Sequence, residues 1–134
     1  MNFDNLKVGM LATDDHTITE NLINQFGELS GDYNAIHFND EVAIQKGFKG
    51  RIAHGMIIGA FISKLIATKL PGDGSIYLSQ NLNFKLPTYL NDKVKVQVKI
   101  INLHSKRRIV ELETIALKEH LILVEGSAIV KLIS

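Results

Sequence analysis

The spacing of apolar residues changes its period partway along the chain. In the first part, apolar residues recur at the spacing of one helix face: Leu22, Ile23, Phe26 and Leu29. Thr19 is suited to the N-cap of this helix, and Gly31 is suited to the position just beyond its end. The pattern therefore predicts a helix over about residues 19–30.

Two further helices are predicted downstream. A short one is expected over residues 40–47, where three apolar residues follow an aspartate. The second runs from residue 54 to about residue 70 and is apolar almost all round, so we expect it to be buried on most sides. Pro71 and Gly72 then end it.

After residue 75 the period becomes that of a strand. One run alternates polar residues with apolar residues that are predicted to form a packed face: Ile76, Leu78, Leu82, Phe84 and Leu86. The alternation repeats over residues 93–100, and more loosely over 108–117 and 121–133. Turns are predicted between these runs, at Asn91-Asp92, His104-Ser105 and Lys118-Glu119. An apolar helix followed by antiparallel strands predicts an α+β fold in which a sheet wraps around one buried helix.

Length and composition predict a single domain over residues 1–134. The chain is 46% hydrophobic, which is enough for one core, and it is too short for two ordinary domains. Its 15 basic and 14 acidic residues nearly cancel, so no broad surface for nucleic acid or an anionic membrane is predicted. Cysteine is absent, which excludes disulfides and thiol catalysis. We find no membrane-spanning stretch and no secretory signal, and therefore expect a soluble cytoplasmic protein.

Two titratable side chains, Asp32 and His37, stand five positions apart in the segment 30–40. Because Gly31 ends the preceding helix, both are expected to project from a loop between packed elements, where catalytic groups are commonly mounted. Such a pair suits acid-base chemistry on a small substrate. On spacing alone, the alternative is an aspartate that caps a turn and an ordinary, partly buried histidine.

A second motif lies in the segment 50–61, where a glycine-containing loop runs into the apolar helix. The first amides of a helix have no partner within the helix. At Gly55 no side chain would shield these donors. With the helix dipole behind it, the Gly55 amide is suited to stabilising a carbonyl oxygen that gains negative charge.

Together these motifs resemble the MaoC-like family of (R)-specific enoyl-CoA hydratases and related hydroxyacyl-thioester dehydratases, which have the hotdog fold. The resemblance covers nearly the whole chain and rests on residues 26–40, on residues 51–56 with the following helix, and on the order of the later elements. The family usually has proline where this chain has Ala35, a change that frees one backbone angle but removes no reacting group. The resemblance implies one hotdog domain, and a homodimer or higher homo-oligomer in which two sheets pair side by side.

The resemblance also implies a hydro-lyase that reversibly hydrates trans-2-enoyl-CoA to (R)-3-hydroxyacyl-CoA. Asp32 and His37 would activate a water molecule together, and the Gly55 amide would polarise the thioester carbonyl. Asn34 would hold the loop, and Ser63 would hydrogen-bond Asp32 or line the pocket. Coenzyme A enters as part of the substrate, so no separate cofactor is expected.

Other residues are expected to bind the substrate or to have no chemical role. Arg51 is the first choice for contact with the phosphates of coenzyme A, and three residues are expected to line an acyl tunnel: Met56, Ile57 and Phe61. His54 is interpreted as a structural part of an Ala-His-Gly turn. No metal site is predicted, because the adjacent residues of Asp14-Asp15-His16 cannot easily converge on one ion.

Three alternative functions remain open at this point. The first is a dehydratase that acts on 3-hydroxyacyl thioesters of acyl carrier protein, which would then be a partner. The second is a hotdog acyl thioesterase. The third is a non-catalytic subunit that binds acyl thioesters, although such a subunit has no need of Asp32 or His37.

Overall fold

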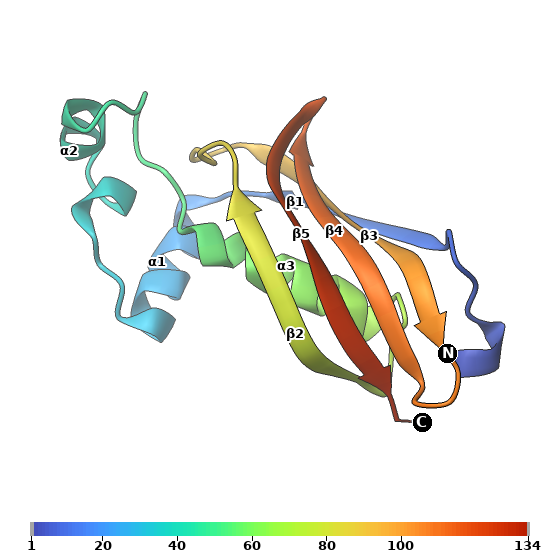
Figure 1. Ribbon diagram of the computed structural model, residues 1–134. Coiled ribbons are helices and arrows are strands. Elements are labelled where there is room, and N and C mark those ends of the chain that lie inside the picture. The colour runs from blue at the N-terminus through green and yellow to red at the C-terminus, as the bar shows by residue number, and fades with distance from the viewer. Residues whose placement is uncertain (1, 134) are drawn as a thin grey trace.

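The computed structural model describes residues 2–133, in which one five-stranded antiparallel sheet curls around a helix (Figure 1). The strand order is β1 (Leu11–Thr17), β3 (Lys93–His104), β4 (Ile109–Lys118), β5 (Leu121–Leu132) and β2 (Ser75–Phe84). This arrangement confirms the predicted α+β fold, and the predicted turns between the later strands are present. The first and last residues of the predicted domain 1–134 lie outside the described residues.

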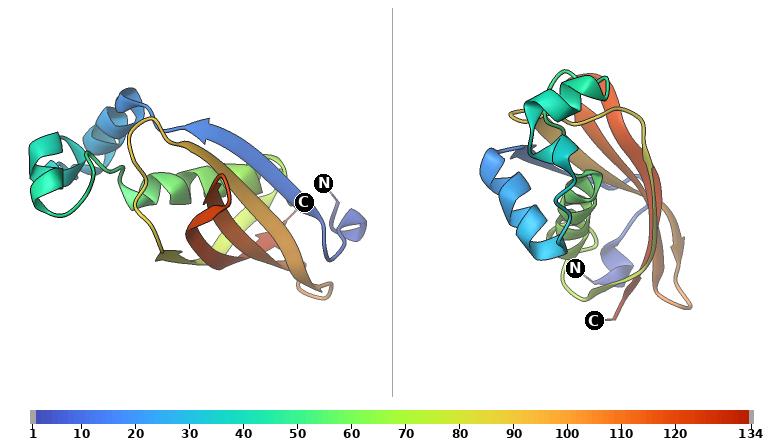
Figure 2. Two further views of the ribbon diagram at one scale, coloured as in Figure 1. Left: turned by 90° about the horizontal axis from the view of Figure 1, so that it is seen from above. Right: turned by 90° about the vertical axis from the view of Figure 1, so that its left-hand side faces the viewer.

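The central helix is α3 (Gly55–Thr68), which lies in the concave side of the sheet (Figure 2). One set of its side chains is buried: Ile57, Ile58, Ile62, Leu65 and Ile66. The helix packs mainly against β3, whose alternate residues Val94, Val96, Val98 and Ile100 are fully or almost fully buried. This confirms the expectation of a helix that is buried on most sides. No helix in the described part of the chain is both long enough and apolar enough to cross a membrane.

The helix α1 (Glu20–Ser30) begins and ends where its caps predict. The Thr19 hydroxyl accepts a hydrogen bond from the Leu22 amide, and Gly31 adopts a left-handed conformation with φ of 75°. Leu29 shares the apolar helix face with Leu22, Ile23 and Phe26 in the sequence pattern, but it is 84% exposed. The reason is the position of α1, which lies near one end of α3 and beyond the end of the sheet, where fewer elements can cover it (Figures 1 and 2).

The edge strand β1 was not predicted from the sequence. Its central residues Asp14, Asp15 and His16 interrupt any alternation of apolar and polar residues. The strand forms because its backbone pairs with β3 along seven residues, from Leu11 opposite Lys99 to Thr17 opposite Lys93. An edge strand with one pairing partner needs less apolar patterning than a central one.

Strand β2 departs from its predicted packed face. A β-bulge at Leu78 reverses the alternation of side chains, so that Ile76 shares a face with Lys131 of β5 while Leu82 faces the core. Four of the five predicted core residues are between 41% and 52% exposed: Ile76, Leu78, Phe84 and Leu86. Among the described strands, β2 has only β5 as a neighbour, so the edge of the sheet is both apolar and unpaired.

Candidate active site

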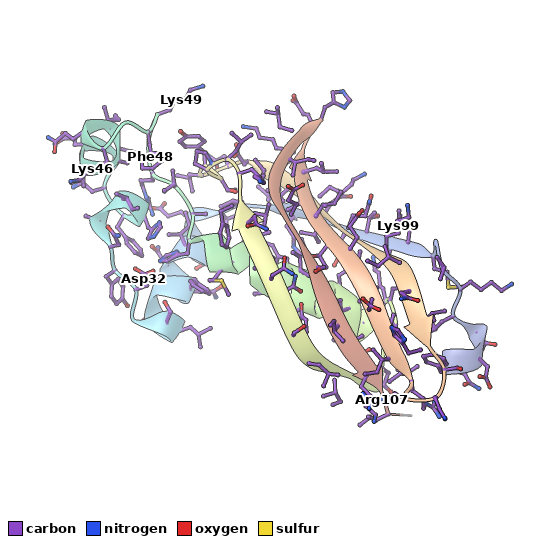
Figure 3. All side chains as sticks on the ribbon, viewed as in Figure 1. Asp32, Lys46, Phe48, Lys49, Lys99 and Arg107 are labelled. Atoms are coloured by element: carbon purple, nitrogen blue, oxygen red, sulfur yellow. The ribbon has the colours of Figure 1, made fainter. Side chains whose placement is uncertain are left out.

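Asp32 lies on the exposed part of the loop between α1 and α2 (Asp40–Gln45) (Figure 3). Hydrogen bonds between residues close along the chain shape this loop. A carboxylate oxygen of Asp32 accepts a hydrogen bond of 3.1 Å from the Asn34 amide. The side-chain oxygen of Asn34 accepts one of 3.3 Å from the Ile36 amide, at the start of the short 3-10 helix η2 (Ala35–His37). Side chains that bond to backbone two residues onward stabilise turns of this kind.

The His37 ring is only 7% exposed, and its Nδ1 lies 2.8 Å from the carbonyl oxygen of Ile52. A carbonyl can only accept a hydrogen bond, so Nδ1 carries the hydrogen and Nε2 presents a lone pair. Burial lowers the pKa of His37 below its ordinary value, although the bond to Ile52 and the charge of Asp32 oppose this. The neutral ring at neutral pH has the electronic form that a general base requires.

Asp32 and His37 converge as predicted, and His54 joins them. One titratable atom of each of the three side chains lies within 4.8 Å of the others. Two atoms at this separation can both bond to a single water molecule, because each such hydrogen bond is about 2.8 Å long. The structure therefore gives Asp32 and His37 the geometry to hold one water between them.

Within residues 2–133, these three residues are also the one cluster of histidine and carboxylate side chains that is close enough together to bind a metal ion. The rings of His37 and His54 are stacked, with centroids 3.9 Å apart and planes inclined by 27°. Lone pairs of two nearly parallel imidazoles lie in their ring planes and do not point at a common ion. The geometry therefore suits water better than a metal.

Gly55 begins α3 beside this group. A Cβ atom at this position would lie 2.6 Å from the Phe84 ring, so any larger residue would force this ring of β2 to move. His54 is the N-cap and makes no side-chain cap hydrogen bond, and within the described residues the Gly55 amide has no hydrogen-bond partner. A free amide at the positive end of a helix can stabilise a developing oxyanion.

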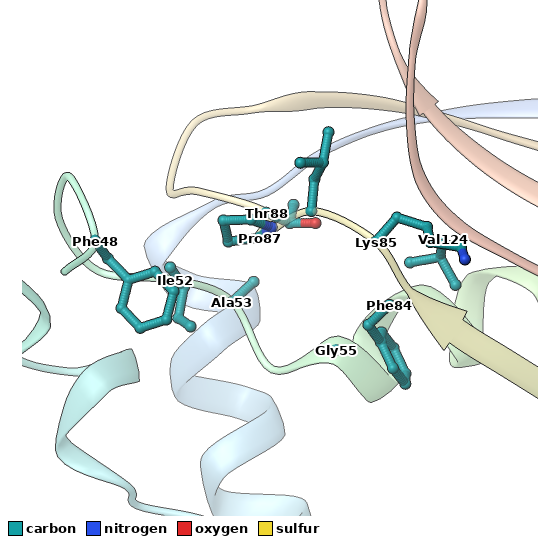
Figure 4. A pocket seen from close by; sticks show the side chains of 10 residues that line it. Phe48, Ile52, Ala53, Gly55, Phe84, Lys85, Pro87, Thr88 and Val124 are labelled. Carbon is teal, nitrogen blue, oxygen red and sulfur yellow. The ribbon is translucent and has the colours of Figure 1, made fainter. Parts of the chain in front are cut away.

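A cavity of about 300 Å³ opens beside Gly55, between the start of α3 and the segment after β2 (Figure 4). Its walls are largely apolar, with one cation and one hydroxyl: Phe48, Ile52, Ala53, Gly55, Phe84, Lys85, Leu86, Pro87, Thr88 and Val124. This volume is at the lower end of the range for pockets that bind small molecules. The sequence patterns did not single out residues 84–88 for binding, because they lie far from the loop along the chain.

A smaller cavity, of about 170 Å³, lies between α1 and α3. Ile57 and Phe61 line it together with five other residues: Leu22, Gln25, Phe26, Leu29 and Ala60. Met56 does not line this cavity and is 56% exposed. Ser63 lies further along α3, half-buried, and makes no hydrogen bond to Asp32 in the described structure.

Arg51 is placed differently from its prediction. Its Nε donates a 2.8 Å hydrogen bond to the His37 carbonyl, and its Nη1 lies 3.0 Å from a carboxylate oxygen of Glu20. The Arg51 side chain is only 10% exposed. These contacts occupy the guanidinium group of Arg51. The structure therefore favours a role for Arg51 in stabilising the loop, rather than the predicted contact with phosphates.

Two histidines have contacts that the sequence did not indicate. His54, interpreted as part of a turn, also stacks on His37 and lies against the rings of Phe26 and Phe38. His16 stacks face to face on Phe61, with centroids 3.7 Å apart. The sequence indicated only that His54 lies near the candidate site, because it directly precedes Gly55 at the start of the apolar helix.

Several known proteins resemble this chain in sequence and in fold. A model of the MaoC-like domain matches residues 5–120. An (R)-specific enoyl-CoA hydratase of Rhodospirillum rubrum is 38% identical over 96% of this chain and 89% of that protein. A mitochondrial 3-hydroxyacyl-[acyl-carrier-protein] dehydratase of Arabidopsis thaliana is 32% identical over 92% of this chain and 75% of that protein. The solved structure of an (R)-hydratase of Aeromonas caviae superposes with a TM-score of 0.92 at 35% identity, covering 96% of this chain and 98% of that one.

We expect His37 to titrate at a pH below 6.5, because its burial disfavours the charged ring. Its C–H resonances, assigned with a His37→Gln variant, would be followed by NMR against pH. Between this lowered pKa and pH 6.5, the unfolded state binds more protons at His37 than the folded state does. The contribution of His37 to the free energy of unfolding therefore decreases as the pH falls through this range. A midpoint at or above 6.5 would contradict the prediction.

Proposed function

The chain belongs to the MaoC-like family, and from this premise we propose that it is an (R)-specific enoyl-CoA hydratase of fatty-acid metabolism. The proposed reaction is the reversible addition of water to trans-2-enoyl-CoA, which gives (R)-3-hydroxyacyl-CoA. One observation above all supports it: Asp32 and His37 lie within reach of a single water, next to the free amide of Gly55. Coenzyme A enters as part of the substrate, and no metal or separate cofactor takes part in the proposed reaction.

The chemistry requires one new C–O bond at C3 and one new C–H bond at C2, with loss of the double bond between them. A water held by Asp32 and His37 attacks C3 and gives a proton to this pair, and the pair returns a proton to C2. The lone pair on His37 Nε2 and the Asp32 carboxylate both favour this transfer. General acid-base help of this kind contributes about 10²–10⁴-fold to the rate.

The Gly55 amide stabilises the thioester oxygen as the enolate forms. It begins α3, so the helix dipole adds to the stabilisation, and one such donor is worth about 10²–10³-fold. The thioester carbonyl therefore lies at Gly55, where the 300 Å³ cavity offers apolar walls to the pantetheine arm. The cavity beside Ile57 and Phe61 would receive the acyl chain.

Lysines around the larger cavity are suited to the phosphates of the substrate. Lys85 lines the cavity and its side chain is 52% exposed, with Glu125 at 3.4 Å as its ion-pair partner. Lys46 and Lys49 flank the cavity residue Phe48 on the loop after α2, and neither has an ion pair within residues 2–133 (Figure 3). These cations replace Arg51 in the proposed phosphate contact.

Dehydration of a 3-hydroxyacyl thioester on acyl carrier protein is the second candidate function. The Arabidopsis relative bears that name, and its reaction is the reverse of the proposed hydration on a different carrier. The same Asp32, His37 and Gly55 groups would serve both directions. A thioesterase or a non-catalytic subunit would not need Asp32 and His37 to return a proton to C2. The presence of both residues therefore favours the hydratase and the dehydratase over these two functions.

The proposed oligomer is a homodimer that joins two β2 strands edge to edge. Apolar residues on β2 and just beyond it are exposed, and the edge offers unpaired backbone groups to a second copy. Such exposure is costly for a monomer in water. A cytoplasmic location is the accompanying proposal.

The function is tested first with purified protein and short-chain trans-2-enoyl-CoA. We expect the ultraviolet absorbance of the conjugated double bond to fall, an (R)-3-hydroxyacyl product by chiral analysis, and no free thiol. Release of thiol would instead identify a thioesterase. Turnover of the carrier-protein thioester alone would identify the second candidate, and no turnover of either would contradict both candidate activities.

In the same assay, Asp32→Asn and His37→Gln should each lower kcat by about 10²-fold or more, because each removes half of the water-binding pair. Both replacements keep the size of the side chain, so the melting temperature is the control for folding. Asp15→Asn, an exposed change on β1, is the matched control and should keep full activity. Full activity in either site variant would remove that residue from the mechanism.

Lys85→Ala should raise KM for the coenzyme A ester by up to about fivefold, since an exposed ion pair contributes about 0.2–1 kcal/mol. The effect should shrink at high salt. The corresponding thioester of N-acetylcysteamine, which has no phosphate, should show no change in KM. Lys99→Ala, on β3 and away from the cavity, is the control (Figure 3). An equal rise for both substrates would argue against a phosphate contact.

The dimer is tested by sedimentation. The wild-type chain of 14.9 kDa should sediment with at least twice that mass. Leu78→Lys, which places a charge on the exposed edge strand, should shift the equilibrium toward the monomer. A wild-type protein that stays monomeric at high concentration would contradict the proposal.

A further inference from the structure

One buried histidine beside the proposed site has no part in the proton transfers. His54 is only 2% exposed, and three rings pack around its imidazole: Phe26, His37 and Phe38. Its Nε2 lies 2.9 Å from the carbonyl oxygen of Asp32. Because that oxygen can only accept, Nε2 is the protonated nitrogen and donates this hydrogen bond.

This bond differs in kind from the others that hold the loop. The remaining hydrogen bonds of residues 31–34 within the described chain join partners no more than four positions apart, such as the Asp32 amide with the Ser30 hydroxyl at 3.1 Å. The bond from His54 spans 22 positions. It therefore anchors the Asp32 backbone to the start of α3, while the other bonds only shape the loop locally.

The need for such an anchor follows from the exposure and freedom of the loop. Residues 31–35 are all exposed, and the Tyr33 ring packs on Phe38, so few packing contacts hold this segment. Ala35 leaves a backbone angle free that a proline would fix. The two reacting groups are thus supported unequally, since His37 is buried and bonded to Ile52, whereas Asp32 depends on its neighbours in the chain and on His54.

We propose that His54 is a positioning residue, whose Nε2–H holds the Asp32 carbonyl so that the Asp32 carboxylate keeps its place opposite His37. This inference rests on the proposed function. His54 directly precedes Gly55, so the same anchor ties the water-binding pair to the amide that receives the thioester oxygen. The other ring nitrogen, Nδ1, is buried and has no hydrogen bond within the described structure, so Nε2 alone makes the tether.

Two variants separate the donor from the ring. His54→Phe keeps an aromatic ring among its neighbours but removes the donor. His54→Gln removes the ring but places an amide donor near the position of Nε2. Loss of the tether misplaces a catalytic group without removing any contact to substrate, so its effect should fall on kcat rather than on KM.

His54→Phe should lower kcat by about tenfold to a hundredfold and change KM by less than about twofold, the scale expected when a reacting group moves by about 1 Å. His54→Gln should recover most of kcat. Melting temperatures of both variants serve as the folding control. The proposal would be overturned if His54→Phe kept the wild-type kcat, or if His54→Gln were no better than His54→Phe.

A second measurement does not depend on activity. In the wild-type protein, ¹⁵N NMR of the imidazoles should show the Nε2–H form for His54 and the Nδ1–H form for His37. Hydrogen exchange at the Asp32 and Asn34 amides should be faster in His54→Phe than in the wild type. The Nδ1–H form at His54, or unchanged exchange in the variant, would overturn the tether. If the wild type had no hydratase activity, the proposed function would fail, while these two measurements would still test the tether.

Discussion

Burial of α3 inside the curled sheet is the constraint on which the position of every candidate site residue depends. Side chains along the helix and the alternate apolar residues of β3 exclude water on both sides of this contact. The helix can neither rotate nor slide without exposing them. Its first turn is therefore held at one end of the sheet, and the free amide of Gly55 is presented at a fixed place and direction.

The loop with Asp32 is then assembled onto this fixed helix start by polar contacts. The segment that leads into α3 pairs on both sides, since the Ile52 amide donates to the Ile36 carbonyl and the Ala53 amide donates to Thr88. The Ile52 carbonyl orients His37, and His54 reaches Asp32. The site thus combines a rigid apolar scaffold with a polar, exposed loop, which is a common way to mount catalytic groups.

Part of the apolar surface that remains exposed lies on the edge strand β2. Strand β2 covers the start of α3 with Phe84, yet its other residues have no neighbour on the open edge within the described structure. The two cavities flank the start of α3, one toward the end of β2 and one toward α1. In the proposed function, the thioester lies across the start of the helix, with its carbonyl at Gly55 and its two ends in different surroundings.

The sequence by itself determined those features that arise between residues close along the chain. Thr19 and Gly31 fixed the ends of α1, the apolar run fixed α3, and the short loop brought Asp32 and His37 together. Only the tertiary structure decided the pairing of β1, the bulge at Leu78, the enclosure of Arg51 and the contacts of His54. Caps and periodicity depend on neighbours within about four residues. The other features depend on which distant segment packs alongside, and no local pattern encodes that choice.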